Sequence, residues 1–206
     1  MIVIVDYGMG NLRSVWMKFE RLKYESKISN NPEDIIKASH LILPGVGHFE
    51  EGIKNINKLN LLEPLNVAVQ QKQIPILGIC LGMQLLTIHS EEGNVDGLGW
   101  INGYTKKFNF DILNDNKQFR IPHVGWNLVE WKNQNFLMNG LDIEERFYFT
   151  HSYAVECLNQ SESVGTTIYG YPFSSVIQKN NIFGTQFHPE KSHLNGLKLI
   201  ENFCKL

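Results

Sequence analysis

The chain has 206 residues, of which 43% are hydrophobic, and its formal net charge is −2. This length and composition predict one domain, residues 1–206, with one sizeable core. The nearly balanced charge gives no reason to expect nucleic acid or a membrane surface as a partner, and no apolar run approaches the roughly 20 residues that span a bilayer.

The first half of the chain alternates short apolar strands with helical stretches. Strands are predicted over 2–5, 24–29, 40–43 and 74–79. Helices are predicted over 12–22 and 32–38, with Asn31 suited to the N-cap before Pro32, and a further helical region ends near residue 71. This alternation predicts an α/β fold with a parallel sheet covered by helices on both faces.

The second half is richer in strands. Short β-rich runs occupy 103–110, 119–123, 127–131, 147–150, 164–169, 173–179 and 182–187, with a turn at Asn180-Asn181. They predict an antiparallel extension beside the parallel sheet, and an amphipathic helix over 194–203 closes the chain.

The three cysteines, Cys80, Cys157 and Cys204, argue against a disulfide framework and for a reducing, cytoplasmic location. The N-terminus lacks the basic region and long apolar run of a signal peptide. No Cys/His cluster has the spacing of a zinc site, so neither a metal nor a cofactor is expected.

Cys80 is the first candidate for chemistry, because it lies between Gly78 and Gly82 at the end of an apolar strand. Glycines on both sides of one reactive side chain allow a sharp strand-to-helix turn and a close approach by substrate. A helix N-terminus after Cys80 would favour the thiolate. The alternative is that Cys80 is a small buried hydrophobic residue, as most free cysteines are.

His188 and Glu190 are the candidate base and orienting carboxylate. Residues i and i+2 of an extended chain point to one side, which predicts contact between them, and Pro189 stiffens the connection. A thiol nucleophile needs a base to take its proton and a third group to orient that base. The alternative is a surface turn. His40, His48, His89 and His193 have no comparable partner in the sequence and are expected to be solvated or at the edge of the core.

An oxyanion site is predicted from Pro44-Gly45-Val46-Gly47, which ends another strand. Ligands of open α/β sheets bind at the carboxyl ends of the strands, where backbone N–H groups can face a developing negative charge. The N–H of Leu81 would be a second donor. In contrast, the segment 6–11 lacks the third glycine of a dinucleotide fingerprint, and no nucleotide site is predicted there.

These motifs together resemble the glutaminase subunits of class I, triad-type glutamine amidotransferases, and among them the ammonia-supplying subunits of imidazole glycerol phosphate synthases. The resemblance is carried in chain order by DYGMGNLRSV, LPGVGHF, GICLGMQ, PHVGWN, FYFTHSY and QFHPEKS. PHVGWN stands where PHMGWN is more usual, and the segments 99–102 and 109–118 look less typical of the family.

The resemblance implies that Cys80 attacks the carboxamide of L-glutamine, with His188 as base and acid and Glu190 as its orienter. It implies that Gly47, Gln84, His151 and Ser152 hold glutamine or shape its pocket. Val46 would lie in an oxyanion strand that rearranges before its donor points inward.

The resemblance also implies a partner, a (β/α)8 synthase subunit that forms a heterodimer with this chain, and Asn11, Trp126 and Lys191 would lie near the docking face. Three alternatives stay open: a paralogue that supplies ammonia for sugar amidation in surface-polysaccharide biosynthesis, a non-catalytic scaffold of the same fold, and a cysteine peptidase on a related fold.

Overall fold

The computed structural model describes residues 1–111, 119–132, 135–142 and 145–206. The predicted segment 109–118 therefore lies mostly outside the described residues. In the described residues a 12-stranded sheet has the order β2-β1-β3-β4-β14-β13-β11-β7-β5-β6, with β12 and β9 attached beside β13, and β10 and β8 form a separate two-stranded sheet.

The helices and strands have the following bounds. The strands are β1 (Ile2–Val5), β2 (Ser26–Ser29), β3 (His40–Gly45), β4 (Ile76–Cys80), β5 (His89–Ser90), β6 (Val95–Asp96), β7 (Gly103–Lys107), β8 (His123–Leu128), β9 (Glu130–Trp131), β10 (Arg146–His151), β11 (Tyr153–Cys157), β12 (Ser163–Tyr169), β13 (Tyr171–Lys179) and β14 (Ile182–Thr185). The α-helices are α1 (Leu12–Leu22), α2 (Pro32–Lys37), α3 (Phe49–Lys58), α4 (Leu62–Asn66), α5 (Leu81–Leu85) and α6 (His193–Phe203), with a π-helical turn at Val67–Gln71. Short 3₁₀ turns lie at Phe136–Met138, Gln160–Glu162 and Pro189–Lys191.

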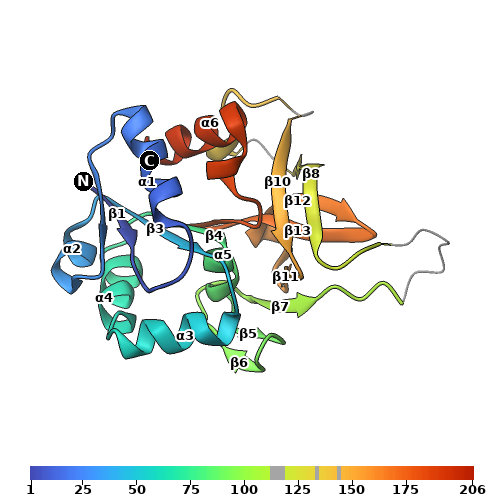
Figure 1. Cartoon of the computed structure of the whole chain (residues 1–206), viewed down its shortest axis with the longest axis horizontal. Helices are drawn as coiled ribbons and strands as arrows, with labels where there is room; N and C mark the ends of the chain where they lie inside the picture. The colour runs from blue at the N-terminus through green and yellow to red at the C-terminus, as the bar shows by residue number, and fades with distance from the viewer. Residues whose placement is uncertain (112–118, 133–134, 143–144) are drawn as a thin grey trace.

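The parallel part of the sheet is buried on both faces. Strands β2, β1, β3, β4 and β14 pair in parallel, and alternate residues of β1 enter different cores. Val3 packs with residues of α2, α3 and α4, whereas Ile4 packs with residues of α1 and α6. Figure 1 shows α1 and α6 on one side of these strands and α3, α4 and α5 on the other. The predicted α/β fold with a covered parallel sheet is confirmed.

The antiparallel extension is also confirmed, since β14, β13, β11 and β7 pair antiparallel in succession. Asn180, with φ of 54°, makes the predicted turn between β13 and β14. The predicted cap of α2 is confirmed as well: the Asn31 side chain accepts a hydrogen bond from Glu33 N, although α2 ends at Lys37 rather than at residue 38.

Two expectations about the second half were wrong, and strand β11 was missed. No strand covers 119–122, where Pro122 has no N–H to give to a ladder, and β8 begins at His123. The predicted strand 127–131 is divided at the buried Val129, because β8 pairs with β10 whereas β9 pairs with β12 of the large sheet. Strand β11 (Tyr153–Cys157), between β7 and β13, was not predicted at all.

Among the described residues, none of the helices combines the length and apolar character required for a membrane crossing.

Candidate active site

Cys80 occupies the sharp turn that the sequence predicts. It is the last residue of β4, its register partner on β3 is Gly45, and α5 begins at the next residue. Its backbone has φ of 54° and ψ of −108°, a region that non-glycine residues rarely adopt. Such strain persists only where the surroundings hold it, and it turns the side chain out of the strand. The helix that follows has only five residues, so the helix dipole contributes less at Cys80 than the sequence suggested.

The two glycines that flank Cys80 are required by close backbone contacts. A Cβ at Gly78 would lie 2.7 Å from Gly82 O and Met83 N, and one at Gly82 would collide with the carbonyl group of Leu43 on β3. Any larger residue would push the turn away from the sheet. The elbow is therefore held from both sides by backbone.

The sulfur of Cys80 has two polar contacts. Gln186 Nε2 lies 3.6 Å from Sγ, and Thr150 O lies 3.9 Å from it. Cys80 is 6% exposed, so the thiol is largely shielded from water yet reachable from one side.

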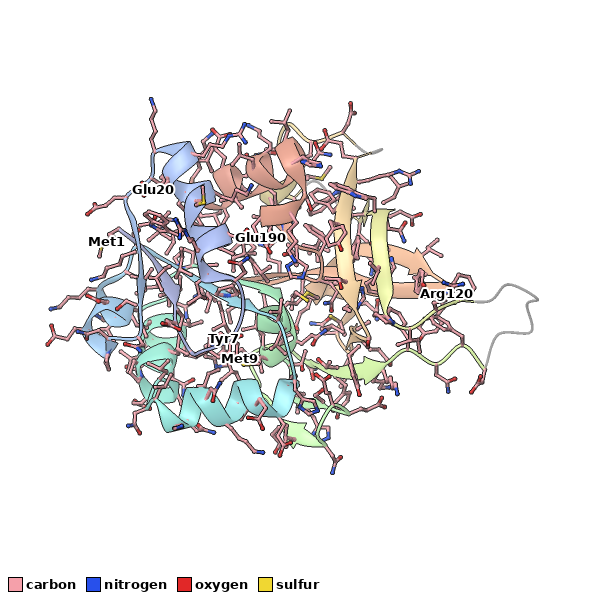
Figure 2. The ribbon with its side chains drawn as sticks, viewed as in Figure 1. Met1, Tyr7, Met9, Glu20, Arg120 and Glu190 are labelled. Atoms are coloured by element: carbon pink, nitrogen blue, oxygen red, sulfur yellow. The ribbon has the colours of Figure 1, made fainter. Side chains whose placement is uncertain are left out.

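His188 and Glu190 make the predicted contact. His188 Nδ1 lies 2.7 Å from Glu190 Oε1, and both side chains are almost fully buried; Glu190 is in the interior of the molecule (Figure 2). The local backbone differs from the expected extended run, because Glu190 lies in the 3₁₀ turn Pro189–Lys191. Ser192 Oγ donates to His188 O at 2.6 Å, and His188 N donates to Tyr148 O at 2.9 Å, so the segment is fixed on both sides.

The surroundings of His188 favour the protonated form of its imidazole. Burial alone would lower the pKa of His188, but the negative charge of an ionised Cys80 and the Glu190 carboxylate raise it above its ordinary value. Within the described residues, His188 Nε2 is buried and has no hydrogen-bond partner. The nitrogen opposite Glu190 is therefore available to take a proton from Cys80.

A hollow of about 310 Å³ opens at Cys80. Its walls come from the turns after β3 and β4 and from the end of β10, and they include Val46, Gly47, Cys80, Leu81, Gln84, Glu92, Pro122, Thr150, His151, Ser152 and Tyr153. The set contains Val46, Gly47 and Leu81 of the predicted oxyanion site and all of the predicted glutamine-binding residues, whereas Pro44 and Gly45 do not line the hollow. A larger cavity of about 1340 Å³ lies over β7, β11 and β13, but no residue of the predicted site lines it. The smaller hollow is therefore the candidate active site.

Glu92 is a pocket residue that the sequence did not predict. Its Oε2 accepts a hydrogen bond from Phe49 N at 2.8 Å, at the start of α3, which fixes the carboxylate at the pocket wall. Nothing in the acidic run around residue 92 distinguishes it from a solvated surface segment. Only the tertiary contact with α3 shows its place.

A pair of neutral histidines supports the wall at His151. His151 Nδ1 lies 2.7 Å from Tyr153 O, so it must donate, and Nε2 is left to accept from His123 Nδ1 at 3.0 Å. Burial lowers the pKa of His151 to about 3 and that of His123 to about 4. Both rings are therefore uncharged at neutral pH.

Two of the three predicted docking residues lie together near the site. Trp126 is 41% exposed, and its ring stacks on His193 at 5.0 Å and contacts the Tyr148 ring at 6.0 Å. Lys191 Nζ lies 5.8 Å from the centre of the same Tyr148 ring. Asn11 lies instead at the start of α1, where its side chain accepts from Ser14 N.

Among the other histidines, His89 differs from expectation because its Nδ1 lies 2.8 Å from Asp96 Oδ1 on the next strand. This pair is on the surface and lines no part of the hollow. No cluster of three or more His, Cys, Asp or Glu residues in the described ranges has the arrangement of a metal site.

Comparison with known proteins agrees with this geometry. Residues 3–206 match the family model described as glutamine amidotransferase class-I. Imidazole glycerol phosphate synthase subunit HisH 2 of Methanococcus maripaludis is 49% identical over 205 residues, covering 100% of this chain and 99% of that protein. The HisH subunit of Leptospira interrogans is 41% identical over 206 residues, covering 100% of both chains.

Solved structures show the same fold at low identity. A crystal structure of a glutamine amidotransferase matches with a TM-score of 0.75 at 17% identity, covering 100% of this chain and 98% of that one. The structure of PurLQS from Thermotoga maritima matches with a TM-score of 0.72 at 17% identity, covering 99% of this chain and 97% of that one.

The chain belongs to the class I glutamine amidotransferase family, as the resemblance implied. Within that family, the relatives that share 41–49% of its sequence over the full length are HisH subunits of imidazole glycerol phosphate synthase.

Proposed function

We propose that this chain is the glutaminase subunit of an imidazole glycerol phosphate synthase, which hydrolyses L-glutamine to glutamate and ammonia. The observation that supports this most strongly is the strained Cys80 at the mouth of an amino-acid-sized hollow, with the buried His188–Glu190 pair beside it. The 41–49% identity to HisH subunits supports the particular synthase.

The chemistry begins with proton transfer from Cys80 Sγ to His188 Nε2. The thiolate attacks the carboxamide carbon, and the oxygen that becomes negative is stabilised by backbone N–H groups of Leu81 and of the segment Val46-Gly47. Protonated His188 then gives its proton to the departing ammonia, which leaves a γ-glutamyl thioester on Cys80. Water, deprotonated by His188, attacks the thioester and releases glutamate.

The hollow offers groups for each end of glutamine. Gln84 and the backbone of His151 and Ser152 can bind polar atoms of the substrate, and the Glu92 carboxylate is suited to the α-ammonium group. A carboxylate at one end of the pocket and a nucleophile at the other would place the carboxamide at Cys80.

A partner follows from the fate of ammonia. Ammonia released into water is protonated and diluted, so an acceptor site must cover the hollow. We propose that a (β/α)8 cyclase subunit docks on the face of Trp126 and Lys191 and also reaches Asn11, in a cytoplasmic heterodimer. It would use the ammonia to make imidazole glycerol phosphate and aminoimidazole carboxamide ribotide in histidine biosynthesis.

The substitution Cys80→Ala tests the proposal, with glutamate formation measured in the presence of the cyclase subunit. We expect turnover to be lost while binding of the cyclase, measured by calorimetry, is unchanged. Cys157→Ala is the matched control, since Cys157 is buried on β11 and does not line the hollow. Substantial glutamate formation by Cys80→Ala would overturn the proposal.

The same active site is also compatible with a different ammonia-consuming partner, because glutamine hydrolysis does not depend on which enzyme uses the ammonia. The names HisH 2 in M. maripaludis and HisH 1 in Campylobacter jejuni number the subunit, and the latter relative is 46% identical to this chain. A paralogue of this kind would supply ammonia for sugar amidation. Stimulation of glutamine hydrolysis by a sugar-amidating synthase, and not by the histidine-pathway cyclase, would favour this alternative.

A further inference from the structure

Gln186 is a fully buried polar residue that the steps above do not use. It follows β14 and precedes His188 by two residues, and its exposed fraction is 0%. Its backbone N–H donates to Ser175 O at 2.9 Å. Burying a side-chain amide costs free energy unless both of its ends are hydrogen-bonded, so the partners of this amide matter.

Both ends of the Gln186 amide have partners in the active site. Its Oε1 accepts from Gln84 Nε2 at 3.0 Å, and its Nε2 lies 3.6 Å from the sulfur of Cys80. Gln84 Nε2 also donates to Tyr153 O at 3.0 Å. A chain of two amides thus connects the wall of the hollow to the nucleophile.

Which amide atoms of Gln84 and Gln186 donate and which accept follows from the contact of Gln84 with Tyr153 O. A backbone carbonyl can only accept, so the Gln84 atom that faces Tyr153 O must be the nitrogen. The same nitrogen faces Gln186, so the Gln186 atom that meets it must be the oxygen. The amide atom of Gln186 that faces Cys80 is therefore the nitrogen, an N–H donor aimed at sulfur.

A donor in this position distinguishes the two forms of Cys80. The neutral thiol can donate its S–H towards Thr150 O, 3.9 Å away. The ionised sulfur only accepts, and hydrogen bonds to a charged acceptor are stronger than those to a neutral one. The titratable groups around this sulfur and in the pocket wall are Tyr7, His188 with Glu190, His151, Tyr153 and Glu92. Gln186 adds a donor that carries no charge and does not titrate.

We propose that Gln186 is a positioning residue, which donates an amide N–H to Cys80 Sγ and favours its ionised form, and that Gln84 fixes the orientation of this amide. The inference rests on the proposed role of Cys80 as the nucleophile. Through Gln84, the same amide chain also connects the glutamine-binding wall to the reactive sulfur.

The test is the pH dependence of Cys80 alkylation by iodoacetamide in the full-length chain, followed by mass spectrometry of the Cys80 peptide. Methionine matches glutamine in length but has no N–H, so Gln186→Met removes the donor. We expect the midpoint of the profile, which belongs to the Cys80–His188 pair, to rise by about one pH unit. Below the midpoint this is a roughly tenfold slower alkylation.

Thr185→Val is the matched control, because it removes a buried hydroxyl from the adjacent residue whose hydrogen bond goes to Phe187 O rather than to Cys80. We expect its alkylation midpoint to equal that of the wild type. An unchanged midpoint in a folded Gln186→Met protein would overturn the proposal.

If circular dichroism shows that Gln186→Met does not fold, the alkylation midpoint of Gln84→Met tests the proposal instead. It leaves Gln186 in place but removes the donor that fixes its amide, and we expect a smaller shift in the same direction. An unchanged midpoint would contradict the amide chain. Glutamine hydrolysis by the wild type with its cyclase is measured separately, and its absence would count against the proposed function without altering the alkylation comparison.

Discussion

Burial controls the chemistry of individual residues in this protein. Cys80, His188 and Glu190 are 6%, 1% and 5% exposed, so little water screens the charges that the thiolate, imidazolium and carboxylate would carry. Glu190 stabilises the imidazolium and fixes which nitrogen of His188 faces Cys80. The proposed proton transfer from Cys80 would therefore meet an imidazole whose orientation is already fixed by Glu190.

The substitution Glu190→Gln should lower kcat for glutamine hydrolysis by about 10² or more, because general acid–base catalysis by an oriented histidine contributes on this scale. An amide removes the charge that raises the pKa of His188, so the pH–rate profile should also shift to lower pH. Steady-state kinetics over a range of pH values checks both effects.

Glu201→Gln is the control for this experiment, since Glu201 pairs with Lys198 and Lys205 on the surface of α6. Equal activity of Glu190→Gln and Glu201→Gln would show that the His188–Glu190 contact has no catalytic role.

Tyr7 carries a hydroxyl that is buried without a hydrogen-bond partner among the described residues. It lies on the connection after β1 (Figure 2), against Gly45, where an added Cβ would collide with it. Burial, and to a lesser degree the charge of Cys80, raise the pKa of Tyr7 far above its ordinary value, so the phenol stays neutral.

Tyr7→Phe should raise the free energy of unfolding by up to about 1 kcal/mol, since an unsatisfied buried hydroxyl is destabilising. Tyr169→Phe should lower it by about 1 kcal/mol, because the Tyr169 hydroxyl donates to Arg120 O at 2.8 Å. Urea unfolding of both variants measures the difference. A loss of stability in Tyr7→Phe as large as that in Tyr169→Phe would contradict the account of this hydroxyl.

At the scale of elements, the two-stranded sheet of β8 and β10 connects the active site to the surface. His123 and His151 are register partners at one end of it, and Trp126 and Tyr148 are partners further along. Tyr148 O accepts from His188 N. The same two strands therefore contact the proposed glutamine pocket, the proposed base and the proposed docking face.

The buried histidine pair of this sheet predicts a pH-dependent stability. The unfolded His123 titrates near pH 6.5 and the folded one at about 4, so between these values the unfolded state binds more protons and stability falls as pH falls. His123→Phe keeps the ring next to Tyr169 but cannot titrate. Its loss of unfolding free energy between pH 6.5 and 4 should be smaller by about 1 kcal/mol or more.

His89 is expected to change the unfolding free energy with pH in the opposite direction to His123. Asp96 raises the pKa of His89, so this pair stabilises the fold at low pH and the contribution is lost as pH rises through the folded pKa. His89→Asn should therefore steepen the loss of stability on acidification. A His123→Phe protein with the same pH dependence as the wild type would contradict the assignment of a neutral buried ring.

The elements that the sequence predicted best are those with one uniform environment. Strands β1 and β4 are apolar throughout because both faces are covered, and α1 and α6 have apolar residues at helical spacing. Strand β11 (YAVEC) was missed because a short run with a charged residue carries no such signal. The division of 127–131 depends on which sheet each part joins, and local sequence does not show that.

The residues of the candidate site were likewise predicted where the local sequence carries a signal. Cys80, His188 and Glu190 belong to motifs with local signals, namely glycines at a strand end and a His-Pro-Glu run. Gln186 offers a weaker signal, as a polar residue in the apolar run before His188. Glu92 has none, since its role depends on a contact with Phe49 that is 43 residues away in the chain.

At the scale of the whole molecule, the hollow at Cys80 and the candidate docking face lie next to each other. They are joined by the backbone hydrogen bond from His188 N to Tyr148 O and by the contacts of the Tyr148 ring with Trp126 and with Lys191. A partner seated on Trp126 would rest directly on strands that hold the proposed base. Activity should therefore depend on the complex and not on this chain alone.

We expect the isolated chain to hydrolyse glutamine slowly and the cyclase to accelerate it by at least about tenfold. Trp126→Ala should reduce the affinity for the cyclase by about 2 kcal/mol, as for an aromatic anchor at an interface, and leave the slow basal rate unchanged. Titration of glutaminase activity with cyclase measures both quantities. Full activity of the isolated chain, with no gain on adding the cyclase, would contradict this dependence.

The most direct test of the central claim is covalent labelling of the wild-type complex with an electrophilic glutamine analogue, followed by peptide mass spectrometry. We predict that one label is incorporated, that it is on Cys80, and that excess L-glutamine prevents it while Cys157 and Cys204 stay unmodified. A complex that hydrolyses glutamine while its label is found on another residue, or on none, would contradict the assignment of Cys80 as the nucleophile.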